Sequence, residues 1–151
     1  MAQETRVHPE TTVRCANCGK QNRVPVAAAG VPRCGNCHRP LPWIVEADDD
    51  TFADVAERAA IPVLVDLWAQ WCAPCRQVTP ALEQVARDLA GQLKLIKINI
   101  DLAQKTQARF DVQAVPTLLL MRGGKVIDRQ IGAAPAAALR TWVEKALARD
   151  T

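Results

Sequence analysis

All six cysteines of this 151-residue chain fall into three C-x-x-C pairs, and the third pair has the setting of a redox site. Cys72 and Cys75 enclose Ala73 and Pro74, follow the apolar run 61–68 and precede apolar residues at helical spacing. A sulfur in the first turn of a helix lies near unpaired backbone N–H groups and a partial positive charge, which favour its thiolate. We therefore expect Cys72 to act as a nucleophile and Cys75 to bond to it. Buried structural cysteines and ligands of a metal are the alternatives.

The other two pairs have the spacing of a structural metal site, with fifteen residues between the pairs. A segment of about 40 residues with so few large apolar side chains cannot fold around a core of its own. Four thiolates around one zinc ion would stabilise it and leave no open position for catalysis. The predicted zinc ligands are Cys15, Cys18, Cys34 and Cys37. Disulfides, or an iron or iron–sulfur centre, are the alternatives.

Two glycines and two histidines accompany these cysteines. Gly19 and Gly35 are expected where the chain turns tightly and points backbone N–H groups at the sulfurs. His8 and His38 could also be ligands, but with four cysteines available we expect them to be solvated bystanders.

Asp66 is the single acid in the apolar run that precedes the third pair. A carboxylate is rarely buried without a partner or a purpose, and burial would raise its pKa toward the range of a general base. The alternative is a solvated acid at the end of a strand.

The segment VDLWAQWCAPC resembles the active-site segment of the thioredoxin family, whose usual motif is WCGPC. Ala73 stands where the family most often has glycine, which we expect to shift the redox potential modestly without changing the reaction class. From Cys15 onward the chain resembles the zinc-containing thioredoxin-2 type. The resemblance implies a protein disulfide reductase that acts by dithiol–disulfide exchange through Cys72 and Cys75.

The resemblance also implies roles for further residues. Asp66 would take the proton of Cys75, and Lys97 would neighbour that acid. Although most X–Pro bonds are trans, the resemblance implies a cis bond before Pro116, facing the disulfide. The client-binding surface would be formed by Trp71, Ala73, Pro74, Val115, Pro116 and Gly132. The implied partners are disulfide-containing client proteins and an NADPH-dependent thioredoxin reductase, with no organic cofactor in the chain itself.

The hydrophobic periodicity predicts an α/β fold in which helices cover both faces of a mixed central sheet. The predicted strands are 43–47, 62–68, 93–100 and a hairpin over 117–121 and 125–131. One helix is predicted after a capping box at Thr51–Asp54. A second is predicted from the Cys72–Cys75 pair to about Ala90, with a kink at Pro80. Two more are predicted over 102–110 and at the C-terminus. We divide the chain into a disordered leader (1–12), a zinc-ribbon-like module (13–41) and a thioredoxin domain (42–151).

Composition and charge favour a soluble globular protein, with 49% hydrophobic and 23% charged residues. The chain has no apolar stretch long enough for a membrane span and no apolar region of a secretory signal at its start. Cysteines in C-x-x-C pairs suit a reducing cell, so we expect a cytoplasmic location and a monomer. The net charge of +3 is weak evidence for an anionic partner, and residues 1–41 contain no aromatic side chain that could stack on nucleic-acid bases.

Other functions fit the same residues. The protein could be a disulfide isomerase or oxidant, because Ala73–Pro74 does not fix the redox potential. It could be a redox sensor whose zinc thiolates release metal on oxidation, or a zinc-dependent binding module on a thioredoxin scaffold.

Overall fold

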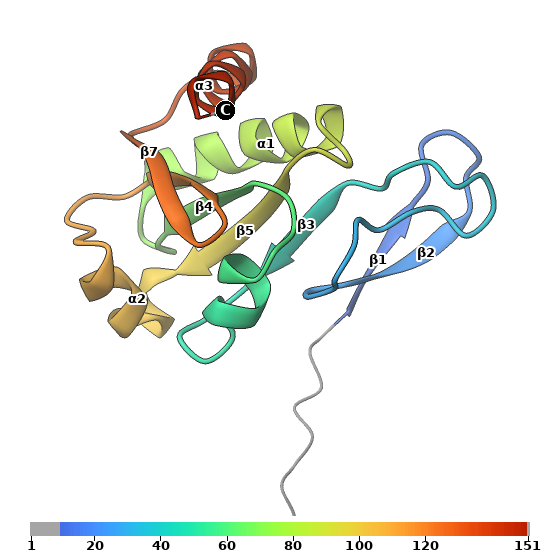
Figure 1. Cartoon of the computed structure of the whole chain (residues 1–151). Coiled ribbons are helices and arrows are strands. Elements are labelled where there is room, and N and C mark those ends of the chain that lie inside the picture. Colours follow the sequence, from blue (N-terminus) through green and yellow to red (C-terminus); the bar gives the residue numbers. More distant parts are fainter. Residues whose placement is uncertain (1–9, 151) are drawn as a thin grey trace, which may run out of the picture.

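The structure is a computed structural model that describes residues 10–150, and its main feature is a five-stranded mixed sheet (Figure 1). The strand order is β3-β5-β4-β6-β7. The first three strands run parallel, and β6 and β7 are antiparallel additions. The strands are β3 (Trp43–Glu46), β4 (Val63–Trp68), β5 (Lys94–Asn99), β6 (Thr117–Arg122) and β7 (Lys125–Ile131). All of these strands lie where the periodicity predicted them.

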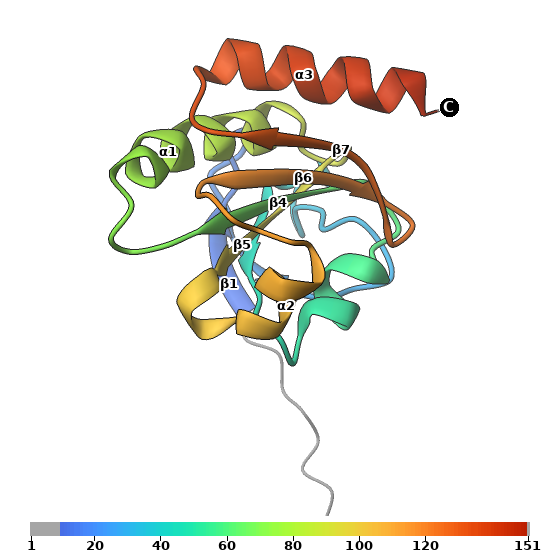
Figure 2. The ribbon, with the colours of Figure 1, turned by 90° about the vertical axis from the view of Figure 1, so that its left-hand side faces the viewer.

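Helices cover both faces of this sheet, as predicted (Figures 1 and 2). The helices α1 and α3 lie together on one face, and η1 and α2 lie on the other. The helical segments are η1 (Ala53–Glu57), α1 (Ala73–Asp88), η2 (Ile100–Leu102), α2 (Gln104–Arg109) and α3 (Ala136–Arg149). None of the helices between residues 10 and 150 has the length and apolar character needed to cross a bilayer. The mixed sheet with helices on both faces confirms the predicted α/β fold class.

The alternation of side chains along β4 places Asp66 under α1. Val63, Val65 and Leu67 belong to the core on the η1 side, whereas Leu64 belongs to the core beneath α1 and α3. Because successive residues of a strand point to opposite faces, Asp66 lies on the same side as Leu64. The acid that interrupts the apolar run therefore faces the helix that carries the third cysteine pair.

The N-terminal part is an antiparallel hairpin of β1 (Glu10–Arg14) and β2 (Gln21–Pro25), beside β3 at the edge of the sheet opposite β7 (Figure 1). Its buried residues Val24 and Val26 share one continuous core with Trp43 and Val45 of the large sheet. The hairpin is thus packed onto the rest of the molecule. Residues 10–12, which the sequence assigned to a disordered leader, form the start of β1; the rest of that predicted leader, residues 1–9, lies outside the described residues.

Lys94 joins the hairpin to the large sheet from inside the core. Its side chain is buried, and its ammonium donates hydrogen bonds of 2.6 Å to the carbonyl oxygens of Val26 and Val55. The same ammonium lies 4.0 Å from the ring centroid of Trp43, whose indole N–H donates to the carbonyl of Pro25 at 2.8 Å. Burial lowers the pKa of Lys94 to about 8. A single side chain therefore connects the hairpin, η1 and strand β3.

Replacing Lys94 with methionine should destabilise the protein and loosen the hairpin first. The change leaves two buried carbonyls without donors, which costs about 1–3 kcal/mol each, partly offset because a cation is no longer buried. We expect the free energy of unfolding to fall by roughly 1–3 kcal/mol in urea. Amide exchange at residues 21–26 should accelerate more than exchange in β4. Lys145→Met, at an exposed lysine of α3, is the control, and equal effects of the two changes would contradict the assignment.

The segment before η1 is not the predicted capping box. The Thr51 hydroxyl accepts a hydrogen bond from the Asp48 backbone N–H and donates to the Asp48 carboxylate. That carboxylate in turn accepts the backbone N–H groups of Asp50 and Thr51. Thr51 therefore closes a local turn with Asp48, and the following helix is a single π-helical turn that begins at Ala53.

Candidate functional site: a disulfide centre and a four-cysteine cluster

The third cysteine pair lies at the predicted junction of strand, turn and helix. β4 ends at Trp68, and α1 begins at Ala73 with Cys72 as its N-cap residue. Cys72 and Cys75 are joined by a disulfide, and the backbone N–H of Cys75 donates to the Cys72 sulfur at 3.2 Å. An N–H group of the first helical turn thus points at this sulfur, a contact that stabilises a thiolate.

A second loop closes over the disulfide from the opposite side. The Val115–Pro116 peptide bond is cis, as the family resemblance implied. The Val115 carbonyl oxygen lies 3.5 Å from the Cys72 sulfur. Cys72 is 4% exposed and Cys75 2%, so both sulfurs are largely covered in the disulfide form.

Apolar side chains surround the disulfide at the surface. Trp71 is 68% exposed, and its indole N–H donates to the Asp101 carboxylate at 3.1 Å. Ile131, at the end of β7, is 61% exposed and was missed by the sequence analysis, because an apolar residue at a strand end carries no signal of its own. The next residue, Gly132, has φ of +97° and donates its N–H to the Pro116 carbonyl. A Cβ there would meet nothing within 4 Å, so glycine is required by the backbone conformation and the space above it is open.

Asp66 is completely buried on the side of β4 that faces α1, as its position in the apolar run suggested. Neither of its carboxylate oxygens has a hydrogen-bond partner among the described residues. Burial raises the pKa of Asp66 to about 7, against the opposing effects of Lys97 and Thr79. The Thr79 hydroxyl is committed elsewhere, because it donates to the Cys75 carbonyl at 2.9 Å.

Lys97 is the immediate neighbour of Asp66 on the adjacent strand, where the two residues share a register position. Its ammonium nevertheless pairs with Glu83 of α1, at 3.4 Å. The sequence analysis missed Glu83. A signal was present, because Cys75, Thr79 and Glu83 recur at intervals of four and therefore lie on one side of the helix.

A cavity of about 400 Å³ opens between Lys97 and the first turns of α1. Its lining includes Cys75, Thr79, Lys97 and the half-buried Trp68. An adjoining cavity of about 460 Å³ shares Trp68 and Lys97 with it and extends to Val26 of the hairpin. The second cysteine and the lysine next to Asp66 thus border one space that water can enter.

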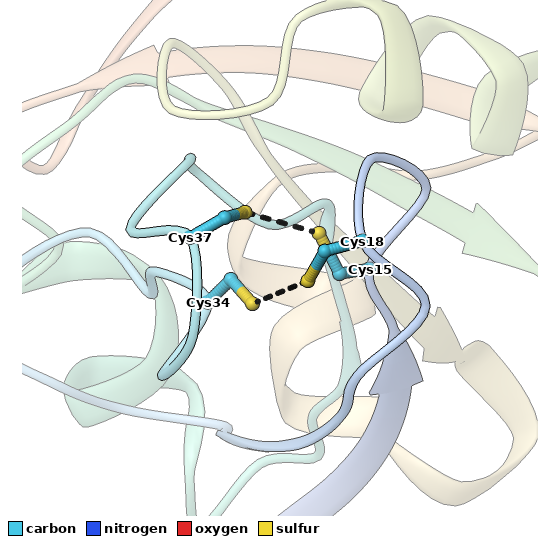
Figure 3. Close-up of side chains that lie close together, drawn as sticks. All are labelled: Cys15, Cys18, Cys34 and Cys37. Carbon is cyan, nitrogen blue, oxygen red and sulfur yellow. Dashed lines mark hydrogen bonds between the residues drawn. The ribbon is translucent and has the colours of Figure 1, made fainter.

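The remaining cysteines form a compact cluster at the other end of the hairpin (Figure 3). Their sulfurs all lie within 4.8 Å of one another, with Cys15 and Cys37 at 3.6 Å and Cys18 and Cys34 at 3.5 Å. A tetrahedral zinc ion with Zn–S bonds of about 2.3 Å would hold its sulfurs roughly 3.8 Å apart, so the donor atoms and their spacing fit such a metal. Hydrogen bonds from backbone N–H groups, above all that of Cys37, lower the pKa of Cys34 to about 6. The four predicted ligands therefore form one site that could hold a metal.

The two loops that carry these cysteines have the same backbone path but different residues at the turn. Gly19 has φ of +80° and donates its N–H to the Cys15 carbonyl, as expected of a tight turn. In the second loop the residue with positive φ is His38, at +66°, which donates to the Cys34 carbonyl. The prediction for Gly35 was wrong in this respect: its N–H donates to the Asn22 side chain and the turn follows Cys37. His38 thus has a structural place that the sequence analysis did not give it.

The comparisons with known proteins agree with this geometry. The sequence model of the thioredoxin family matches residues 43–145. A thioredoxin of Haemophilus influenzae is 38% identical over 102 residues, which cover 68% of this chain and 95% of that protein. A thioredoxin of Pseudomonas aeruginosa is 41% identical over 101 residues, covering 67% of this chain and 94% of that protein.

A third relative also matches the N-terminal part. Thioredoxin C-3 of Corynebacterium nephridii is 35% identical over 136 residues, which cover 88% of this chain and 93% of that protein. This alignment is longer than the segment from Pro42 to the C-terminus, so it includes part of the hairpin module. With a disulfide at the N-terminus of α1 and matches of this extent, the chain belongs to the thioredoxin family and is a thioredoxin-type disulfide oxidoreductase.

Proposed function

We propose that this protein reduces disulfides of client proteins, with Cys72 as the attacking sulfur, Cys75 as the resolving sulfur and Asp66 as the proton acceptor. The observation that carries the proposal is the buried carboxylate of Asp66, which has no hydrogen-bond partner in the described structure and faces α1, the helix that begins at the Cys72–Cys75 pair. An isolated buried carboxylate is costly, and a proton acceptor for a buried thiol accounts for its presence.

The exchange takes place in two steps that conserve sulfur and electrons. In the reduced protein the Cys72 thiolate attacks one sulfur of the client disulfide, so a mixed disulfide forms and the other client sulfur leaves as a thiolate. Cys75 then gives its proton to Asp66 and attacks the Cys72 sulfur. The second client sulfur leaves, and the Cys72–Cys75 disulfide forms. The client gains two electrons and the protein loses two.

The surface around the disulfide would bind the client as an extended chain. The backbone of Val115 can pair with such a chain, because it borders the Cys72 sulfur and does not belong to a strand. Trp71, Ala73 and Pro74 form an exposed rim, and the open space over Gly132 admits the client backbone. Ile131 adds an apolar contact at the same surface.

The oxidised protein must be reduced again by a partner, for which we propose an NADPH-dependent thioredoxin reductase. A dithiol carries two electrons and needs no organic cofactor of its own. Cysteines confined to C-x-x-C pairs suit a reducing compartment, so we place the reaction in the cytoplasm and expect a monomer.

For the cluster of Cys15, Cys18, Cys34 and Cys37 we propose one zinc ion with a structural role. The four thiolates would complete a tetrahedral site with no open position, so the metal would contribute folding energy to the hairpin and take no part in the exchange. Iron can also bind four thiolates, and metal analysis of the purified protein distinguishes the two.

The Asp66→Asn variant tests the role of the carboxylate. We expect resolution of the mixed disulfide to slow by about tenfold or more at pH 7 and to lose the rise with pH that is centred near 7 in the unchanged protein. Rapid mixing with a fluorescent disulfide peptide measures this step directly. Asp111→Asn, at an exposed acid, is the control.

The same variant has a second expected effect, on stability. Between about pH 4 and pH 7 the carboxyl of Asp66 is protonated in the folded protein but ionised in the unfolded chain, because folding raises its pKa. The free energy of unfolding of the disulfide form therefore falls as the pH rises through that window. Asp66→Asn should abolish this fall and raise the free energy of unfolding above pH 7 by roughly 2–4 kcal/mol. If the variant were neither slower nor more stable, Asp66 would not be an ionisable buried base.

A further inference from the structure

Two opposite charges lie side by side under α1 without pairing. Asp66 and Lys97 occupy the same register position on adjacent parallel strands, and both border the helix. A lysine in that position would be expected to bind the buried carboxylate and stabilise its charge. The structure instead leaves both Asp66 oxygens without a partner and pairs the Lys97 ammonium with Glu83.

Glu83 is placed for this contact by the helix. It lies two turns beyond Cys75 on the same side of α1, with Thr79 between them. The side chains of Lys97 and Glu83 are 22% and 30% exposed, so the pair is in contact with solvent, whereas Asp66 is completely buried. Thr79 faces the carboxylate as well: it lowers the pKa of Asp66, although its hydroxyl donates to the Cys75 carbonyl.

The other groups around Asp66 do not replace the missing counterion. On β6 the residue paired with it is Leu118, which is apolar and buried. Glu46 of β3, which pairs with Lys97 in register, lines the cavity of about 400 Å³ and carries a negative charge, so it cannot act as a counterion for Asp66. The charged groups that act on Asp66 are therefore Lys97 from β5, which favours its ionised form, and Glu83 from α1, which opposes it.

We propose that Glu83 is a positioning residue for the exchange reaction, which holds the Lys97 ammonium on the helix side of the site and so keeps Asp66 free to accept the proton of Cys75. The inference rests on the role proposed above for Asp66. With Lys97 drawn aside, the carboxylate remains basic enough to take a proton from a thiol. Lys97 also lines the cavity that reaches Cys75, so the position of its ammonium bears on the surroundings of the resolving sulfur.

Replacing Glu83 with glutamine tests the proposal. The freed ammonium of Lys97 should turn toward Asp66, and the ionisation constant of Asp66 should increase by about threefold, or roughly half a pH unit. The readout is the ¹³C chemical shift of the Asp66 carboxyl carbon, titrated in the disulfide form, which does not depend on activity. The pH midpoint of mixed-disulfide resolution should move to lower pH by a similar amount.

A matched control and a double variant separate this role from a general effect of charge. Glu57→Gln removes an acid of nearly equal exposure, 29%, from an ion pair with Arg109 away from the site, and should leave the Asp66 titration unchanged. In a Lys97→Gln background, Glu83→Gln should have a much smaller effect than in the unchanged protein, because its contribution passes through the lysine.

Two results would overturn the proposal. An unchanged Asp66 titration in Glu83→Gln would show that Glu83 does not set the position of Lys97. An equal shift with and without Lys97 would show that Glu83 acts on Asp66 directly, without any positioning of the lysine. Because Asp66→Asn tests the base independently, a failure here leaves the proposed exchange reaction standing.

Discussion

Replacing Cys72 with serine should reduce the rate of protein disulfide reduction by at least about a thousandfold, because serine forms no thiolate and no disulfide. Replacing Cys75 with serine should have a different outcome. The Cys72 thiolate can still attack, but nothing resolves the product, so the protein should accumulate as a mixed disulfide with its client. Reduction of insulin measures the first effect, and non-reducing electrophoresis with mass spectrometry measures the second.

The pair of variants also identifies which sulfur attacks. If the geometry at the start of α1 determines reactivity, the trapped client is bonded to Cys72, which receives the Cys75 backbone N–H. Covalent capture by the Cys72→Ser variant through Cys75, at a rate equal to that of the reverse variant, would contradict this order. Both proteins should keep the metal proposed for the four-cysteine cluster, since that cluster lies at the far end of the hairpin.

Replacing Cys34 with alanine should have the largest effect on the N-terminal module. Cys34 is 1% exposed, and its loss removes one of four thiolates from the cluster. Structural zinc contributes about 10–16 kcal/mol of apparent binding free energy in small domains, which a hairpin of this size cannot replace. We expect bound metal to fall from one equivalent to nearly none.

Amide exchange locates the damage within the chain. Protection should be lost in β1 and β2, whereas β4, β5 and β6 should remain protected, because their core extends beneath α1 and α3. Cys75→Ser is the control for loss of a buried cysteine, and it should keep one equivalent of metal. A Cys34→Ala protein that still bound one equivalent would show that the cluster is not a four-ligand site.

Local patterns in the sequence predicted most of the fold. The apolar run of β4 and the helical spacing after Cys75 predict the junction that holds the disulfide. The structure has this strand and this helix at the predicted positions. The four-cysteine cluster was predictable for the same reason, because two C-x-x-C pairs constrain their own turns. The error at Gly35 came from assigning the tight turn by residue type, whereas the position after the second cysteine carries it, and His38 adopts it.

The residues that the sequence analysis missed depend on contacts between distant elements. Lys94, which was missed, looks like the predicted site residue Lys97 in the stretch KLIKIN, yet Lys94 is buried in the core and Lys97 is paired with Glu83. The alternation of β5 contained the distinction, since Lys94 points to the same face as Ile96 and Ile98. The sequence could not identify the two carbonyls that accept hydrogen bonds from the Lys94 ammonium. They belong to Val26, which follows β2, and to Val55 in η1, both far from Lys94 along the chain.

The placement of Lys94 also bears on how such a chain could have evolved. In a thioredoxin without the hairpin, a lysine at this position would keep the Val55 carbonyl but lose the Val26 carbonyl as an acceptor. A chain that gained or lost the N-terminal module would therefore change the surroundings of position 94, so the best residue there depends on whether the module is present.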